Sequence, residues 1–271
     1  MAIEQKMKYI GKCPKCELNY IKENEELCSV CSRKRFSDEW YSNDNVNSQE
    51  RERKLKEIEE RQKREELQDK NEILDIMKSY GFEGFCHTAN LNNFINIYKS
   101  GFLKSRYLLE TEGYKFEDNA ESSVIEKTSD FIKKKVRFYY RSITPTNISA
   151  YMNHNQKHPV LMVFDESLIY EDCMFTDGCP VSILTKVGPK LKYVKSFNWK
   201  EIFERGPFDV CNMATRNYRN AEFLMKDKVS ISKAKTIYFK SKEDMDFAIK
   251  KLGNDDRFMV NENKFYKEYV W

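Results

Sequence analysis

The feature that most restricts the fold of this 271-residue chain is a stretch without glycine or proline between residues 48 and 80. It is crowded with Glu, Lys, Arg and Gln, and its sparse apolar residues become more frequent toward its end. This pattern predicts one long solvated helix that stops near Gly81 and whose last turns pack on the following domain. Such a helix can serve as a spacer or in self-association, and it divides the chain into three parts.

The segment before this helix contains two closely spaced cysteine pairs. Cys13, Cys16, Cys28 and Cys31 follow a C-x2-C, eleven-residue gap, C-x2-C pattern. The two thiolates of each pair can face one cation, and two pairs complete a tetrahedral zinc site. We therefore expect a zinc ribbon over residues 1–36, stapled by the metal because it is too small to fold otherwise. The spacing is compatible with nucleic-acid contact and equally with a purely structural role.

The composition supports a large folded domain and excludes an integral membrane protein. Hydrophobic residues make up 40% of the chain and aromatic residues 14%, which is enough for a sizeable core. Charged residues make up 33%, no apolar run has the length of a membrane span, and the N-terminus lacks the apolar segment of a signal peptide. We therefore expect a cytoplasmic protein. The formal net charge of +4 permits a nucleic-acid partner without requiring one.

The chain beyond the helix has the sequence pattern of a mixed α/β domain, with frequent aromatic residues. We expect residues 37–80 to hold a linker and the helix, and residues 81–271 to form one α+β domain of many short strands and few helices. The domain has no G-x-G-x-x-G or Walker sequence and no regular alternation of strands and helices. The pattern therefore argues against a Rossmann or P-loop nucleotide-binding domain.

The stretch from Arg216 to Met225 places one carboxylate at the entrance of an apolar segment. Glu222 follows a basic, amide-rich approach and precedes Phe223, Leu224 and Met225 in an expected buried strand. An ionised carboxylate loses hydration there, so it must find partners or shift its pKa. The pattern fits a salt bridge to Arg219 or Arg216 at a strand end, and it also fits a catalytic carboxylate.

Two upstream segments supply further polar groups. His87 ends a short apolar strand, and the turn after it leads into a helix expected to stop at Gly101. Arg141 ends an alternating strand that begins at Val136, and a guanidinium at such a place can bind a phosphate bidentately. Either residue alone could equally be an ordinary structural residue.

Three segments in order resemble the DarT family of DNA ADP-ribosyltransferases. They are His87-Thr88-Ala89-Asn90-Leu91-Asn92-Asn93-Phe94 with Gly101-Phe102-Leu103, then Phe138-Tyr139-Tyr140-Arg141-Ser142-Ile143-Thr144-Pro145-Thr146, and finally Arg219-Asn220-Ala221-Glu222-Phe223-Leu224. The likeness covers residues 82–240 and omits the ribbon and the helix. Ala89 stands where the family tends to have Thr, and Ser142 where it often has Pro.

The resemblance implies an ADP-ribosyltransferase-like mixed α/β domain that transfers ADP-ribose from NAD to a base of single-stranded DNA. Glu222 would be the catalytic carboxylate, assisted by Arg141, and it would stabilise the oxocarbenium character that develops as the nicotinamide–ribose bond breaks. The residues expected to contact NAD are His87, Asn93, Tyr140 and Arg141.

The same resemblance assigns the substrate strand to the loop from Phe208 to Arg219. Arg216, Tyr218 and Arg219 combine cations with an aromatic ring, as readers of single strands do. The family further implies a toxin or phage-defence role and a macrodomain antitoxin. Two alternatives stay open at this point: the same transfer onto RNA, and a non-catalytic zinc-ribbon protein that binds nucleic acid.

Overall fold

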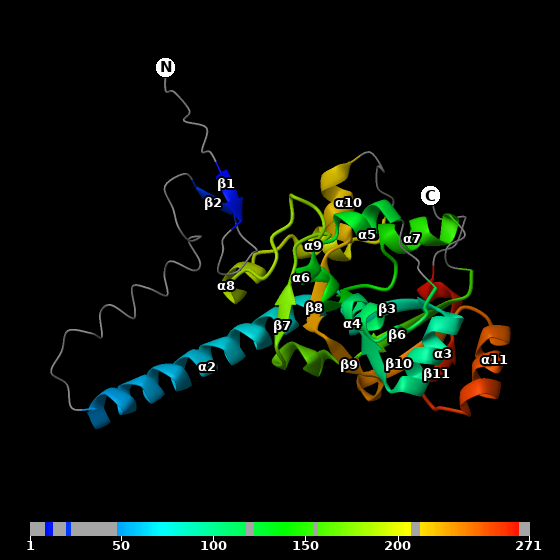
Figure 1. The fold of residues 1–271 in the computed structure, drawn as a ribbon, viewed down its shortest axis with the longest axis horizontal. Helices are drawn as coiled ribbons and strands as arrows, with labels where there is room; N and C mark the ends of the chain where they lie inside the picture. Colours follow the sequence, from blue (N-terminus) through cyan, green and yellow to red (C-terminus); the bar gives the residue numbers. More distant parts are fainter. Residues whose placement is uncertain are drawn as a thin grey trace, which may run out of the picture. The chain divides into compact units, whose positions relative to one another are not determined.

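The computed structural model describes residues 9–12, 20–22, 48–117, 122–153, 157–206 and 212–265 (Figure 1). The chain forms two compact units, residues 1–63 and 64–271. In the first unit β1 (Tyr9–Lys12) and β2 (Tyr20–Lys22) pair antiparallel. The expected zinc ligands Cys13, Cys16, Cys28 and Cys31 lie outside the described residues, so the zinc ribbon stays a prediction.

The expected long helix is confirmed as α2 (Ser48–Ser79), and Gly81 follows it with a left-handed φ of +83°. Its last turns carry Ile73, Leu74 and Met77, which are at most 6% exposed. These side chains belong to the core of the second unit, which begins within the helix at Arg64.

The second unit is built on a seven-stranded sheet with the order β11-β10-β6-β3-β5-β8-β7. The strands are β3 (Phe85–Asn90), β5 (Lys135–Tyr139), β6 (Pro159–Phe164), β7 (Cys173–Phe175), β8 (Glu222–Lys226), β10 (Ala234–Phe239) and β11 (Phe258–Val260). All neighbours pair antiparallel except β10 and β11, which are parallel.

A separate two-stranded sheet joins β4 (Phe102–Lys104) to β9 (Lys228–Ser230). The remaining elements are α3 (Leu91–Ser100), α4 (Arg106–Thr111), α5 (Ser122–Lys127), α6 (Asp130–Lys133), α7 (Pro145–Met152), η1 (Glu166–Tyr170), α8 (Leu191–Val194), α9 (Trp199–Phe203), α10 (Met213–Arg219), η2 (Ile231–Lys233), α11 (Lys242–Leu252) and η3 (Glu262–Lys264). The α+β class is thus confirmed, with more helices than the sequence pattern predicts. None of the helices in the described part is long and apolar enough to span a bilayer.

The core lies mainly on one face of the sheet, where α3 and α11 pack side by side (Figure 1). Phe85, Phe138, Phe164 and Phe223 are fully buried there, and the rings of Phe85 and Phe223 stack at 3.8 Å between centroids. A smaller cluster around Cys86, Leu161, Val163 and Phe265 covers part of the opposite face. Because both faces of the sheet are covered, the sequences of the central strands are nearly continuous runs of apolar residues.

The strands β3 and β5 diverge in the middle of the sheet. β3 pairs with β6 along all six of its residues, but it pairs with β5 only between Cys86 and Tyr139. The carbonyl group of Arg137 is therefore left out of the ladder on that side and needs another donor. His87 Nδ1 lies 2.9 Å from this oxygen. The divergence opens a notch in which side chains of both strands can meet a ligand.

Candidate active site

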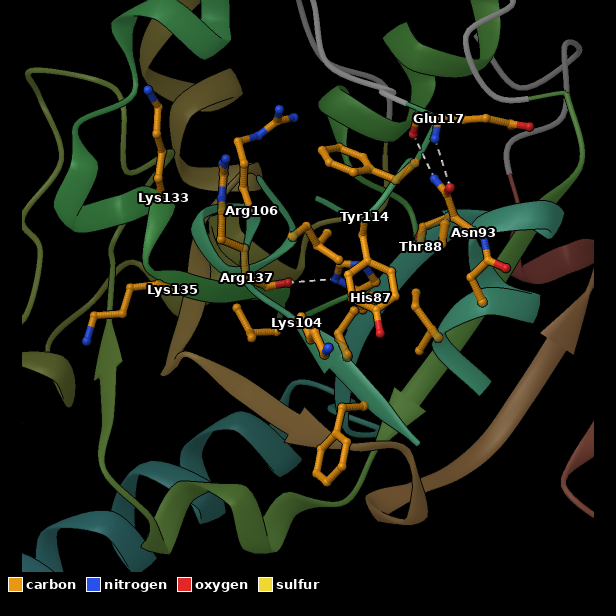
Figure 2. Close-up of a pocket in the computed structure, with 18 of the residues that line it drawn as sticks. His87, Thr88, Asn93, Lys104, Arg106, Tyr114, Glu117, Lys133, Lys135 and Arg137 are labelled. Atoms are coloured by element: carbon orange, nitrogen blue, oxygen red, sulfur yellow. Dashed lines mark hydrogen bonds between the residues drawn. The ribbon is translucent and has the colours of Figure 1, made fainter. Parts of the chain in front are cut away.

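A cavity of about 270 Å³ lies in the notch between β3 and β5. We call it the notch cavity. His87, Thr88 and Ala89 line it from β3, and Lys135, Val136 and Arg137 line it from β5. Residues 102–117 and α6 supply much of the remaining wall (Figure 2).

The wall of the notch cavity is strongly basic. Its charged residues are six cations and one carboxylate, namely Lys104, Arg106, Lys115, Lys133, Lys135 and Arg137 against Glu117. Several cations also have partners at the rim, such as Lys104 with Glu112 and Arg106 with Glu110. A cavity of this composition favours an anionic ligand, and cations with rotatable side chains suit a pyrophosphate.

Asn93 faces this cavity from the first turn of α3, where its amide is already engaged. Its Nδ2 donates to the Glu117 carbonyl at 2.7 Å, and its Oδ1 accepts from the Glu117 amide at 2.9 Å (Figure 2). Asn90 and Asn92 donate to the two carboxylate oxygens of Glu117 at 3.0 and 2.7 Å. The three asparagines therefore anchor the end of the wall segment.

His87 lies at the centre of the notch cavity (Figure 2). Burial lowers its pKa below the usual value, against the opposing hydrogen bond to the Arg137 carbonyl. Because a carbonyl can only accept, Nδ1 carries the proton, and in the neutral ring Nε2 is then a hydrogen-bond acceptor. His87 can thus accept a hydrogen bond from a ligand hydroxyl.

Glu222 begins β8, and only 1% of its surface is exposed. It pairs in register with Tyr139 of β5. Its backbone amide donates to Thr176 Oγ1 at 2.8 Å, and its carbonyl accepts from the Tyr140 hydroxyl at 2.9 Å. These contacts fix the main chain at the point where the carboxylate leaves it.

The carboxylate of Glu222 is held by Arg137. Arg137 Nε and Nη2 each donate to a different carboxylate oxygen at 2.6 Å, a bidentate ion pair. Burial raises the pKa of Glu222, and the charge and hydrogen bonds of Arg137 oppose that rise. Glu222 does not itself line the notch cavity, whereas Arg137 does, so Arg137 connects the carboxylate to the cavity.

The sequence pattern does not single out Arg137. It lies within an alternating strand, and its partner is 85 residues away, so only the pairing of β5 with β8 brings the two together. One signal is present: Arg137, Tyr139 and Arg141 alternate with the buried Val136, Phe138 and Tyr140. A polar face at that position predicts side chains directed away from the main core.

Tyr140 and Arg141 directly follow β5, and neither of them lines the notch cavity. The Tyr140 ring is buried in the core, and its hydroxyl binds the backbone of Glu222. The Arg141 guanidinium donates to the carbonyls of Ile202, at 3.3 Å, and Glu204. Burial lowers the pKa of Arg141 to about 10, with a further contribution from the charges of Arg219 and Arg205.

These residues line a second cavity of about 460 Å³. Its cations are Arg141, Arg205, Arg219 and Lys264. The structure therefore separates the expected NAD contacts into two groups. His87 and Asn93 lie at the notch cavity, and Tyr140 and Arg141 lie at the second cavity.

The expected loop before Glu222 is wrong for residues 213–219, which form the helix α10. The Asn212 side chain caps this helix by accepting from the Thr215 amide at 3.1 Å, and neither glycine nor proline interrupts it. Of the three expected strand-binding residues, Arg216 is exposed, Tyr218 is half-buried against the core, and Arg219 is 6% exposed.

Arg219 is engaged inside the domain. Its Nε donates to Glu201 at 2.8 Å and its Nη1 to the Gly206 carbonyl at 2.5 Å. This geometry suits a residue that ties α10 to α9 and the segment after it. Arg216 is the member of the three that is presented to solvent.

Comparisons with known proteins agree with this architecture. A family model described as "ssDNA thymidine ADP-ribosyltransferase, DarT" matches residues 86–266, two thirds of the chain. No curated protein sequence matches the chain.

Solved structures share the fold at low sequence identity. One is the Thermus sp. 2.9 DarT in complex with ADP-ribosylated ssDNA, with a TM-score of 0.57 and 15% identity over 67% of this chain and 95% of that one. The complex of the same protein with NAD+ gives a TM-score of 0.55 and 14% identity, covering 67% and 96%.

A third similar structure is the Thermosipho africanus DarTG in complex with ADP-ribose, with a TM-score of 0.55 and 14% identity. The match covers 68% of this chain and 51% of that longer one. At these identities the structures show the shared fold, and the family model shows membership. The chain belongs to the DarT family.

Proposed function

We propose that this protein transfers ADP-ribose from NAD to a base of single-stranded DNA. The observation that carries the proposal is the buried carboxylate of Glu222, held by Arg137 at the edge of a basic notch cavity within a DarT-type sheet. The family description names thymidine as the acceptor, and the Thermus sp. 2.9 DarT has been solved with NAD+ and with ADP-ribosylated ssDNA.

NAD would occupy the notch cavity. The cations of its wall suit the pyrophosphate, and the neutral His87 ring offers an acceptor for a ribose hydroxyl. Asn93 supports this site by fixing the wall at Glu117 rather than by offering a free amide. This placement assigns to the notch cavity the β3 residues that follow the pairing point Cys86 and the β5 residues that precede its partner Tyr139.

The chemistry follows from the position of the carboxylate. The bond between C1′ of the ribose and the nicotinamide nitrogen breaks, and nicotinamide leaves with the bonding electron pair. The positive charge that develops on the ribose is stabilised by the negative Glu222. A nitrogen of the base donates its electron pair to C1′, and its proton passes to Glu222 or to water.

Mass spectrometry of oligonucleotides tests the proposal. Matched single-stranded DNA and RNA, with and without thymidine or uridine, are incubated with the protein and NAD. We expect an adduct of one ADP-ribose on thymidine-containing DNA, accompanied by release of nicotinamide. Glu222→Gln, which removes the charge and keeps the size, should form no adduct although it still binds NAD.

The other results have distinct meanings. An adduct on RNA alone would replace DNA by RNA as the acceptor. Intact NAD and unmodified oligonucleotides would contradict the transferase and favour a nucleic-acid-binding protein without catalysis. An adduct that persists in Glu222→Gln would remove this residue from the mechanism.

The remaining parts of the proposal concern the N-terminal unit and the biological setting. We place Zn²⁺ on Cys13, Cys16, Cys28 and Cys31, supported by the pairing of β1 with β2, since these strands bracket the first cysteine pair in the chain. We further propose a toxin or phage-defence role with a macrodomain antitoxin, supported by the fold shared with DarTG. Growth arrest on expression, relieved by a co-expressed macrodomain that removes the mark, tests that role.

A further inference from the structure

We infer that Arg137 is a positioning residue for the transfer reaction, because its guanidinium holds the buried Glu222 carboxylate in its ionised form and in a single orientation beside the notch cavity. This inference rests on the proposed function for its catalytic readout. The ion pair itself can be tested without any activity.

The first argument concerns geometry. Arg137 binds both oxygens of Glu222 at 2.6 Å in the bidentate arrangement that fixes a carboxylate most tightly. The strand that carries it is fixed at the same point, since the Arg137 carbonyl accepts from His87. A shift of β5 would therefore move the carboxylate and the histidine of the cavity together.

The second argument concerns charge. Glu222 is 1% exposed, and a buried carboxylate without a cation takes up a proton rather than remain charged. Among the described residues near Glu222, Tyr139 of β5 and Cys179 after β7 have pKa values raised by burial and by the Glu222 charge, so both are neutral at neutral pH. Arg216 of α10 acts on Cys179. Arg137 is the cation in hydrogen-bond contact with the carboxylate.

The third argument concerns the reaction. A protonated Glu222 cannot stabilise positive charge on the ribose, so activity is lost as the pH falls through the pKa of this group. Arg137 opposes the rise that burial imposes on that pKa. Removing the guanidinium must therefore move the acidic limb of the rate profile to higher pH.

The catalytic test compares the pH dependence of kcat at saturating NAD in four proteins. In Arg137→Met we expect the acidic limb to move upward by about 1–3 pH units, the effect of one close opposite charge on a carboxylate. Arg137→Lys, which keeps the charge and loses the bidentate geometry, should move it less and still lower kcat.

The matched control is Arg257→Met. Arg257 also holds a carboxylate, Asp255, at 2.6 Å, and it lines neither the notch cavity nor the second cavity. The loss of the Arg257 guanidinium should lower the thermal stability without moving the acidic limb of the pH profile. An acidic limb of Arg137→Met that coincides with that of the wild type would overturn the inference.

The second test uses thermal unfolding and needs no activity. Without Arg137 the folded-state pKa of Glu222 rises further above its unfolded value, so the stability that accompanies protonation is present at low pH and is lost as the pH rises. The unfolding midpoint of Arg137→Met should therefore fall further below that of the wild type as the pH increases from about 5 to about 8.

The same comparison in a Glu222→Gln background should show a smaller deficit that does not change with pH. Equal, pH-independent deficits in both backgrounds would overturn the inference whatever the activity. If the deficit of Arg137→Met depends on pH as expected but the wild type modifies no oligonucleotide, the result would contradict the proposed function alone.

Discussion

Asn93 illustrates how one residue can be assigned to the right cavity and given a different task there. The resemblance to DarT implies that it contacts NAD, and the structure places it at the notch cavity. Both polar atoms of its amide, however, bind the backbone of Glu117. Asparagine is suited to this because its amide can donate and accept at once, as a backbone group does.

We predict that Asn93→Ala weakens NAD binding by releasing the cavity wall. Each of the two hydrogen bonds is worth about 1 kcal/mol, so their loss would lower affinity by up to about thirtyfold. Glu117→Ala, which keeps the backbone bonds and removes those from Asn90 and Asn92, should weaken binding as well. Calorimetric titration with NAD measures both. A loss confined to Asn93→Ala would indicate direct contact with the nucleotide instead.

At the residue scale, the sequence indicates Glu222 correctly as an unusual carboxylate but not its partner. The apolar run after it predicts burial, and Glu222 is buried. The nearby Arg216 and Arg219 are the expected salt-bridge partners, yet Arg219 binds Glu201 and the carboxylate binds Arg137. Successive side chains point in different directions around a helix, whereas β pairing brings together residues from distant parts of the chain. Proximity along the chain is therefore a poor guide to the partner of Glu222.

At the scale of elements, local signals that do not depend on pairing are confirmed. The amphipathic pattern of residues 242–252 predicts the helix α11, which has these bounds, and α3 ends at Gly101 with a left-handed φ of +75°. The strand β6 also matches its apolar run. The helix α10 escapes prediction because it is short and most of its residues are polar or basic, and only its contacts with α9 and the core define a buried side.

One further element, the turn after β7, is held against Glu222 by α10. Thr176 Oγ1 accepts from the Glu222 amide, and Asn217 Oδ1 accepts from the Cys179 amide and the Thr185 hydroxyl, both at 3.1 Å. A Cβ atom on Gly178 would lie 2.1 Å from Asn217 Nδ2 and 2.7 Å from Thr185 Oγ1. An alanine there would force the Asn217 and Thr185 side chains to move, and the Asn217 side chain holds the turn.

We predict that Gly178→Ala displaces this turn and lowers transferase activity. Overpacking of this kind costs about 1–3 kcal/mol, and the thermal midpoint should fall by several degrees. The control is Gly206→Ala, whose Cβ would meet only the carboxylate of Glu204, at 3.2 Å. Thermal unfolding and a transfer assay on both variants measure the effect. Equal unfolding midpoints and equal activities of the two variants would show that the turn adapts and does not hold Glu222.

At the scale of the whole molecule, the long helix belongs to two units. Its charged first half reads as solvated, and its last turns complete the core of the catalytic unit, which begins at Arg64. The sequence predicts the packing of these turns, but a helix appears as one continuous element in a hydrophobic pattern. The core contacts of individual turns emerge only from the tertiary structure.

We therefore predict that a chain starting at Arg64 folds and transfers ADP-ribose, whereas a chain starting at Gly81 does not fold. The shorter chain lacks Ile73 and Met77, both fully buried. Losing each such side chain costs about 2–5 kcal/mol, which together approaches the total stability of about 5–15 kcal/mol for a domain. Circular dichroism and the oligonucleotide assay measure the outcome.

Two further comparisons separate the contribution of the buried helix residues from that of the N-terminal unit. In the full-length chain, Leu67→Ala should be neutral and Ile73→Ala destabilising, because Leu67 is 51% exposed on the same helix and Ile73 is buried. Zinc should be present in the full-length protein and absent from the chain that starts at Arg64. A folded, active chain starting at Gly81 would show that the helix is only a spacer, and zinc retained after the truncation would place the metal outside the four N-terminal cysteines.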